Sequence, residues 1–449
     1  MQNLLPHLPK IDTLLQEPAL EHLHKPLLKK IAQNYIQSLR TQILEHTLSQ
    51  VPDYPAILAT LQAKYHSLTT PTLKPLINAT GIVLQTNLGR SIFSEKIINK
   101  ILPLLSQYTN LEYDIQQGKR GERYSHIREI ICTLFDCEDA LVVNNNAAAV
   151  MLIINTFAKD KEVLISRGEL VEIGGSFRIP EVIKQSGAIL QEVGSTNKTH
   201  LKDYQNALTP NTAMAIKVHQ SNFAQIGFTQ DVPYPALKEF AQRHGIIDYY
   251  DVGSGYITGI TSKEPSLLEI AKADPSLVSF SGDKLLGGAQ AGIIFGKAEL
   301  ISQLKQNHLL RALRIDKISL ALLQETLLAY LTEELDSIPT LQMLRLTQAK
   351  LEERANTLES KLKAIKNLTT QTIKTDSKAG GGSLPTESFP SYGVQVRHTA
   401  LSAQSFSTKL RQAGLIARIH NDEILLDVRC IDEKDFEKIE EIIRKICEA

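Results

Sequence analysis

The sequence has few cysteines, and their spacing excludes two kinds of site. Only four cysteines occur among 449 residues, and no two of them form a Cys-x-x-Cys pair. We therefore expect neither a disulfide framework nor a zinc site, but reduced thiols and no bound metal. Cys132 and Cys137 are predicted to lie within one helix, whereas Cys430 and Cys447 belong to the last predicted strand and helix.

Net charge and long apolar runs are also missing. Lysine plus arginine and aspartate plus glutamate each number 49, so the formal net charge is zero. A polyanionic partner would have to bind local basic patches, because the bulk charge does not attract it. The most apolar stretch, residues 147–158, is too short to span a bilayer, and residues 1–7 do not resemble a signal peptide. We expect a cytoplasmic protein with no membrane partner.

The composition favours a globular protein. Hydrophobic residues make up 43% of the chain and charged residues 22%, which excludes a disordered chain and a collagen. A length of 449 residues corresponds to two or three domains with ample core.

Residues 1–68 are predicted to form a small helical domain. Apolar residues recur at helical spacing from Pro26 to Leu48, and a second helix is predicted from Pro55 to His66. Two prolines indicate that residues 69–76 are a linker. The first 70 residues hold six lysines and arginines against five acidic residues, so their charge does not by itself indicate nucleic-acid binding.

Residues 77–330 are predicted to form an α/β catalytic domain. Short apolar runs alternate there with helical patterns, which is typical of a mainly parallel sheet. Two of the predicted helices cover residues 147–157 and 173–185. The expected strands are residues 140–143, 162–165, 188–190, 213–218, 246–250, 277–280 and 292–295.

Residues 331–449 are predicted to form a small α+β domain. A helical zone from Glu299 to about Lys366, broken near Pro339, leads into it. Asn421 and Asp422 suit a hairpin turn, and the glycines of residues 380–382 are expected to form a mobile loop. The expected strands are residues 368–374, 392–397, 415–420 and 423–429, and the expected helices are 403–413 and 432–447.

Two polar clusters in the α/β domain can carry chemistry. Lys284 follows an apolar strand and precedes a glycine-rich turn, where a buried lysine with a lowered pKa can form a Schiff base. An isolated Ser-x-x-Lys is more often part of a surface loop. Asp251 ends another apolar strand, where a carboxylate can keep a pyridine nitrogen protonated; an aspartate that merely caps a turn is about as common.

A third cluster is an asparagine-rich turn before an alanine-rich helix. Asn145, Asn146 and Ala147 would place free backbone N–H groups at the start of that helix, which suits a phosphate group as well as ordinary capping. The order phosphate turn, aspartate, lysine within one α/β domain resembles pyridoxal-phosphate enzymes of the aspartate-aminotransferase fold type, fold type I.

Longer motifs extend this resemblance almost from end to end. The chain resembles the bacterial L-seryl-tRNA(Sec) selenium transferases, also called selenocysteine synthases. The motifs that carry the resemblance are residues 77–81 with 86–90, 118–121, 167–175 with 177–180, 194–197, 219–223, 280–288 with 290–292, and 310–317.

The resemblance implies roles for particular residues. Pyridoxal 5′-phosphate is the implied cofactor, with Lys284 as its lysine and Asp251 as the partner of its pyridine nitrogen. His219 and Ser281 are implied contacts of the same cofactor. It also implies that Asp283, beside the lysine, assists proton transfer to the leaving hydroxyl.

The resemblance also gives three arginines a role. Arg311 and Arg314 are three residues apart on a predicted helix, so they are expected to share a face. With Arg90 they would hold selenophosphate, the selenium donor of the family. An unassigned Arg-x-x-Arg is more often a solvated helix face. The basic residues between Lys119 and Arg128 receive no role.

The implied reaction converts seryl-tRNA(Sec) into selenocysteyl-tRNA(Sec). Lys284 removes the α-proton, the seryl hydroxyl leaves, and selenium adds at the β-carbon. The N-terminal helical domain is implied to bind the tRNA, and homo-oligomers are implied, as dimers arranged in a ring.

Parts of the sequence also suit three alternative functions. The nearest is a pyridoxal-phosphate lyase or ammonia-lyase acting on a small amino acid. A non-catalytic tRNA-binding protein is disfavoured by the presence of Lys284 and Asp251. A cysteine desulfurase is disfavoured because no cysteine follows Lys284 in a suitable loop.

Overall fold

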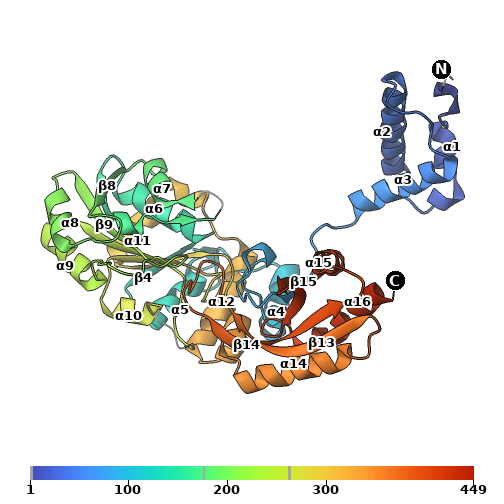
Figure 1. The fold of residues 1–449 in the computed structure, drawn as a ribbon. Coiled ribbons are helices and arrows are strands. Elements are labelled where there is room, and N and C mark those ends of the chain that lie inside the picture. The colour runs from blue at the N-terminus through green and yellow to red at the C-terminus, as the bar shows by residue number, and fades with distance from the viewer. Residues whose placement is uncertain (1–3, 175–176, 261–263, 449) are drawn as a thin grey trace. The chain divides into compact units, whose positions relative to one another are not determined.

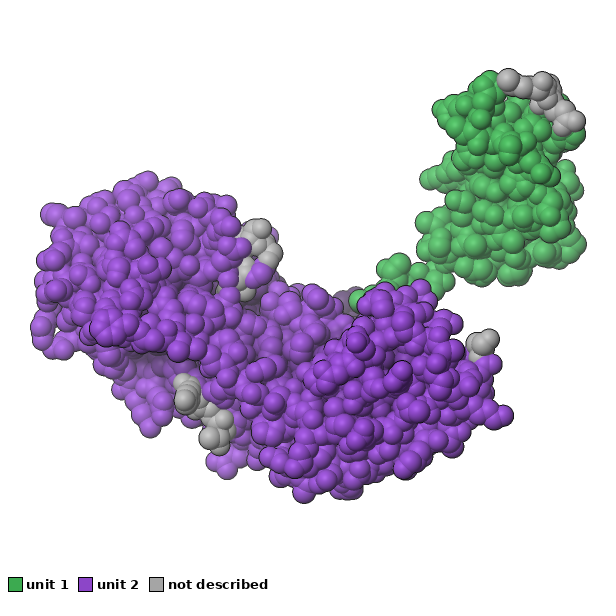
Figure 2. Space-filling model, viewed as in Figure 1, with its two compact units in different colours: residues 1–75 green, residues 76–449 purple. Residues whose placement is uncertain are grey.

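The chain divides into two compact units, residues 1–75 and 76–449, drawn in different colours in Figure 2. The computed structural model describes residues 4–174, 177–260 and 264–448. The division falls inside the segment expected to be a linker. Across the described ranges, no helix has both the length and the apolar character needed to cross a membrane.

The first unit is helical. Its elements are η1 (Leu5–His7), α1 (Ile11–Leu15), η2 (Pro18–Leu20), α2 (Lys25–Leu44) and α3 (Tyr54–Thr69). Both predicted helices are present, and α3 begins where the Asp53 side chain accepts a hydrogen bond of 2.8 Å from the backbone N–H of Ala56. The apolar face of α2 is buried as expected. The core residues of this unit are Leu14, Leu20, Leu23, Leu28, Ile31, Ala32, Ile36, Leu39, Ile57 and Leu61.

The second unit contains a seven-stranded sheet in the order β4-β12-β11-β10-β9-β5-β8. β12 runs antiparallel to both neighbours, and all other adjacent strands are parallel, so the prediction of a mainly parallel sheet is confirmed. All seven strands overlap the predicted ones. They are β4 (Asp139–Val143), β5 (Glu162–Ser166), β8 (Ile189–Val193), β9 (Thr212–Val218), β10 (Ile247–Gly253), β11 (Leu277–Ser281) and β12 (Gly292–Gly296).

Helices pack against this sheet and bury its apolar side chains (Figure 1). They are α5 (Ser125–Phe135), α6 (Asn146–Phe157), α7 (Ile179–Gln185), α8 (Leu201–Ala207), α9 (Tyr234–His244), α10 (Leu267–Lys272), α11 (Ala298–Gln306) and α12 (Lys317–Leu331). A further helix, α4 (Glu95–Ser106), packs against α12. Short elements between them are η3 (Thr86–Leu88), β2 (Tyr113–Asp114), β3 (Lys119–Arg120), η4 (Arg167–Glu169), β6 (Glu172–Ile173), β7 (Phe177–Arg178) and η5 (His308–Arg311).

Two features of the helices differ from the prediction. The helix expected over residues 173–185 begins only at Ile179, because Pro180 suits a first turn and the preceding residues form the β6–β7 pair. Residues 175–176 of that prediction lie outside the described residues. The break expected near Pro339 is confirmed, since α12 ends before this proline and Pro339 begins a new helix. The same zone is also interrupted between α11 and α12, which was not predicted.

Cys137 lies outside the helix that was expected to contain both it and Cys132. α5 ends at Phe135, and Asp136 adopts a left-handed conformation with φ 48°. The N–H of Cys137 then donates to the carbonyl of Cys132 at 3.3 Å, which closes the helix end.

A five-stranded sheet in the order β1-β15-β16-β14-β13 forms the C-terminal part. β1 (Ile77–Ala79) was expected in the catalytic domain but pairs in parallel with β15. Asn421 and Asp422, with φ of 50° and 58°, form the predicted hairpin turn. The other elements are η6 (Leu335–Ser337), α13 (Pro339–Arg345), α14 (Gln348–Leu362), β13 (Leu368–Ser377), β14 (Phe389–His398), α15 (Ala403–Gln412), β15 (Leu415–His420), β16 (Glu423–Asp427), η7 (Glu433–Asp435) and α16 (Phe436–Cys447).

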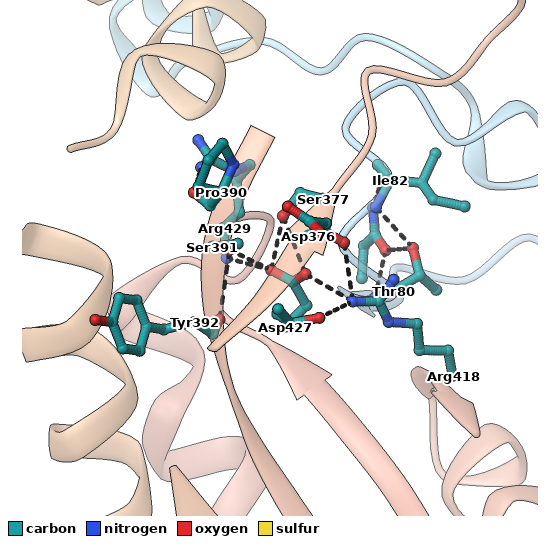
Figure 3. A network of polar contacts seen from close by, with 12 residues as sticks. Thr80, Ile82, Asp376, Ser377, Pro390, Ser391, Tyr392, Arg418, Asp427 and Arg429 are labelled. Carbon is teal, nitrogen blue, oxygen red and sulfur yellow. Dashed lines mark hydrogen bonds and ion pairs between the residues drawn. The ribbon is translucent and has the colours of Figure 1, made fainter. Parts of the chain in front are cut away.

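Two glycines allow close packing between the segment after β1 and the C-terminal part of the chain. A Cβ on Gly81 would lie 2.2 Å from Oδ2 of Asp427, and a Cβ on Gly380 would lie 2.3 Å from Cγ2 of Ile82. The glycine run expected to be a mobile loop is therefore packed against residues 82–84. Asp427 itself is fully buried at the centre of a polar network (Figure 3).

Candidate active site

Lys284 lies on a tightly closed loop between β11 and β12. The loop is fixed by backbone hydrogen bonds from Gly282 to Ala291 (2.9 Å) and from Leu285 to Ser254 (3.0 Å). A Cβ on Gly282 would lie 2.4 Å from the carbonyl oxygen of Ala289, so only glycine fits there. The loop therefore holds the lysine in one position inside the protein.

The surroundings of Lys284 favour its neutral amine. The residue is only 4% exposed. Burial lowers the pKa of the Lys284 amine, and the positive charge of Arg90 lowers it further, against the opposing charges of Asp251 and Asp283. Arg90 pairs with Asp283, with Nη1 2.7 Å from Oδ2. The neutral amine is the form that can act as a nucleophile or a base.

Asp251 is buried in β10, near its C-terminal end. Asn146 Nδ2 donates to Asp251 Oδ1 at 2.8 Å. Burial raises the pKa of the Asp251 carboxyl, while the bond from Asn146 and the nearby charges of Lys284 and His219 act in the opposite direction. The structure thus joins Asp251 to the asparagine turn, which lies over a hundred residues earlier in the chain.

His219 follows β9 and lies beside Asp251. Its backbone N–H donates to the Asp251 carbonyl at 2.9 Å, and its Nε2 lies 3.1 Å from Oε1 of Glu264. Glu264 was not among the predicted site residues. It lies in the segment between β10 and α10, and no sequence pattern indicated that it would reach the imidazole.

The asparagine turn forms the start of α6. Asn145 caps the helix, since its side chain accepts from the N–H of Ala148 at 2.8 Å. The N–H groups of Asn146 and Ala147 are in the first turn, where the helix itself supplies no acceptor. Among the described residues, Oδ1 of Asn144 and Asn146 and Oγ of Ser254 are buried without a hydrogen-bond partner.

These features fit a phosphorylated pyridine cofactor. The helix start offers donors to a phosphate, the buried Asp251 carboxylate suits a ring nitrogen, and Lys284 offers an amine to an aldehyde. These three partnerless atoms, among others elsewhere in the described residues, lie on the asparagine turn and beside the loop that holds Lys284, as expected for a site that a polar ligand completes. Ser281, the last residue of β11, is buried next to this loop.

Arg311 and Arg314 do not lie on one helix. Arg311 ends the short 3-10 helix η5, and Arg314 forms a bridge with Val143, because Asn144 N–H donates to the Leu313 carbonyl at 2.9 Å. Both arginines line a cavity of about 480 Å³. Arg90 does not line it, so within one chain the three arginines do not form the expected fork.

The topology and the buried lysine and aspartate place the chain among the aspartate-aminotransferase-like enzymes of fold type I, which confirms the expected fold class. Residues 76–432 match the family described as L-seryl-tRNA selenium transferase. The chain belongs to this family, as the sequence motifs predicted.

Full-length relatives agree with this assignment. The L-seryl-tRNA(Sec) selenium transferase of Helicobacter hepaticus is 52% identical over 99% of both chains. The same enzyme of Wolinella succinogenes is 49% identical over 99% of this chain and 100% of its own length. A solved D-glucosaminate-6-phosphate ammonia-lyase shares the fold, with a TM-score of 0.59 and 20% identity over 85% of this chain and 99% of that one.

Proposed function

We propose that this chain converts seryl-tRNA(Sec) into selenocysteyl-tRNA(Sec), with pyridoxal 5′-phosphate as cofactor and selenophosphate as selenium donor. The observation that carries the proposal is full-length similarity to L-seryl-tRNA(Sec) selenium transferases in a chain whose Lys284 and Asp251 share one buried site. Because the substrate would be an aminoacylated tRNA, we infer that this chain acts in the cytoplasm.

The cofactor would be held by residues of four elements. Lys284 would bind it through Nζ, and Asp251 would pair with the ring nitrogen, its orientation fixed by Asn146. The start of α6, with Asn145, Asn146 and Ala147, would receive the phosphate. His219 and Ser281 would complete the pocket. When bound, this cofactor supplies an electron sink for bond breaking at the α-carbon of an amino acid.

The side chains around Lys284 divide the proton transfers. Because its pKa is lowered, Lys284 Nζ can accept the proton from the α-carbon of the seryl group. Asp283 lies next to it in the chain and is positioned by Arg90 at 2.7 Å, so it can relay to the leaving hydroxyl the proton that Lys284 has taken from the α-carbon. The tightly packed loop keeps Lys284 and Asp283 in fixed positions relative to each other.

Arg311 and Arg314 would hold the selenium donor through their shared cavity. Arg90 would join them only from a second copy of the chain, because the Arg90 of the same chain does not line that cavity. An exposed apolar stripe on α4, formed by Ile98, Leu102 and Leu105, supports assembly with another copy. We propose a homo-oligomer built from dimers.

The N-terminal unit would bind the tRNA. The curated relatives cover this unit as well as the catalytic part, since their similarity extends over 99% or more of the chain. This unit is a helical domain with a hydrophobic core of its own, and a lyase that acts on a free amino acid would not need such a domain.

The test is a product assay with the purified protein loaded with cofactor. Seryl-tRNA(Sec) and selenophosphate should yield selenocysteyl-tRNA, and ordinary seryl-tRNA(Ser) should yield none. Absence of product from the first tRNA, with deamination of a small amino acid instead, would contradict the proposal in favour of a lyase.

A further inference from the structure

Glu112 places its carboxylate among three arginines. Arg123 donates to Oε1 through Nε at 3.0 Å and Nη2 at 2.7 Å, and Arg120 Nη2 lies 3.2 Å from Oε2. Arg314 Nη2 also donates to Oε1. A carboxylate held by several guanidiniums occupies the same kind of donor set that a phosphate would use.

These residues line the cavity of about 480 Å³ that also contains Arg311. Five lysines and arginines line it against two glutamates, Glu112 and Glu122. Lys305 is already paired with Asp139 at 3.0 Å. The cavity therefore keeps an excess of positive charge even with Glu112 in place, and Glu112 offsets only part of it.

Two of the three arginines have an anchor besides Glu112. Arg123 Nη1 also donates to the Ile315 carbonyl. The backbone of Arg314 is fixed by its bridge to Val143, in the strand that leads directly into the asparagine turn. The anion cavity and the proposed cofactor site are thus connected through β4, while Glu112 sits on a separate segment next to the short β2–β3 hairpin.

Glu112 can leave without breaking a regular element. It precedes β2, and its carbonyl accepts from Gly121 N–H at 3.1 Å across the hairpin. The hairpin itself has only two residues in each strand and is largely exposed. Rotation of the Glu112 side chain would free the guanidiniums and remove its tie to Arg120 on β3, which loosens this short hairpin and no longer element.

We propose that Glu112 is a displaceable internal counter-ion: it occupies the arginine site in the free enzyme and is exchanged for a phosphate-like dianion when the donor binds. The inference rests on the proposed function, because that function supplies the phosphate-like donor. Glu112 thereby sets which anions enter, since only an anion that binds the arginines better than a carboxylate replaces it.

The test titrates the cofactor-loaded full-length protein with inorganic phosphate in a calorimeter. Glu112→Gln keeps the shape and one neutral acceptor but removes the competing charge, so phosphate should bind about tenfold more tightly. The control is Glu122→Gln, which removes the same charge from the same cavity. Glu122 forms no ion pair within the described ranges, and we expect its substitution to change the affinity less than about twofold.

Unchanged or weaker phosphate binding by Glu112→Gln would overturn the proposal, because Glu112 would then only position the arginines. Hydrogen exchange of the wild-type protein gives a second readout if this variant does not fold. Phosphate should speed amide exchange in residues 113–120 as Glu112 is released; slower or unchanged exchange would overturn the proposal. Neither readout needs turnover. Failure of the selenocysteyl-tRNA assay would therefore contradict the proposed function without deciding whether phosphate displaces Glu112.

Discussion

Replacing Asp427 by alanine should strongly destabilise the C-terminal sheet. This fully buried carboxylate accepts hydrogen bonds from Ser377 Oγ (3.0 Å), Ser391 Oγ (2.9 Å) and the backbone N–H of Arg429 (3.1 Å) (Figure 3). It also pairs with Arg418 Nη2 at 3.2 Å. These partners come from β13, β14, β15 and the residues after β16, so one side chain joins most of the sheet.

The magnitude follows from what the substitution leaves behind. Two buried hydroxyls and one backbone N–H would lose their acceptor, at about 1–3 kcal/mol for each group that stays unsatisfied. Arg418 adds less, because its side chain is 33% exposed and also donates to Thr375 Oγ1 at 2.6 Å. We expect a loss of about 3–5 kcal/mol. With an unfolding entropy near 2.1 cal/mol/K per residue, that lowers the melting temperature of the second unit by roughly 5 °C.

Scanning calorimetry of the full chain provides the measurement. Asp376→Ala is the matched control, because Asp376 lies on β13 of the same sheet and its side chain is exposed. The control should melt within about 1 °C of the wild type, as surface substitutions usually do. If Asp427→Ala melted with its control, the network would contribute little, and the reasoning from unsatisfied buried groups would be refuted.

Three further predictions concern the active site. Lys284→Ala should abolish covalent capture of pyridoxal phosphate, measured as loss of the absorbance of the protein-bound cofactor. In the wild type, capture should rise with pH around a midpoint below about 10.4, the pKa of an ordinary lysine, because the lowered pKa of Lys284 keeps its amine neutral at lower pH. A midpoint at or above that value would contradict the argument that burial lowers this pKa. Asp251→Asn should reduce turnover at least about a hundredfold while capture by Lys284 persists; near-normal turnover in single-turnover kinetics would remove Asp251 from its assigned role. Gly282→Ala should weaken cofactor retention measured by dialysis, because its Cβ would meet the Ala289 carbonyl oxygen at 2.4 Å; full retention would show that the loop relaxes without cost.

Much of the fold was predictable because the local signals agree with the tertiary structure. The core strands contain runs of apolar residues that are fully buried, such as residues 163–165. The Asn421-Asp422 turn was predictable because both residues tolerate a left-handed backbone. Motif order also indicated Lys284 and Asp251, which the structure brings close enough for each to affect the other's pKa.

What the sequence did not predict depends on contacts between distant segments. The position of Arg314 is set by its bridge to Val143, so helical spacing from Arg311 gave the wrong geometry. Glu112 and Glu264 belong to no recognisable motif. They are identified only by their contacts, Glu112 with Arg123 and Glu264 with His219. The early end of α5 depends on a left-handed Asp136, and this single aspartate lacks the neighbouring turn residue and flanking strand patterns that indicated the Asn421-Asp422 turn.

The central claim is that Lys284 moves a proton at the α-carbon of the seryl group carried by the tRNA. The most direct measurement is the release of tritium from seryl-tRNA(Sec) labelled at the α-carbon, with the cofactor-loaded enzyme and no selenium donor. The account predicts tritium release by the wild-type protein, none by Lys284→Ala, and none from labelled seryl-tRNA(Ser). Retention of the label by the wild-type protein, or its release by Lys284→Ala, would contradict the account.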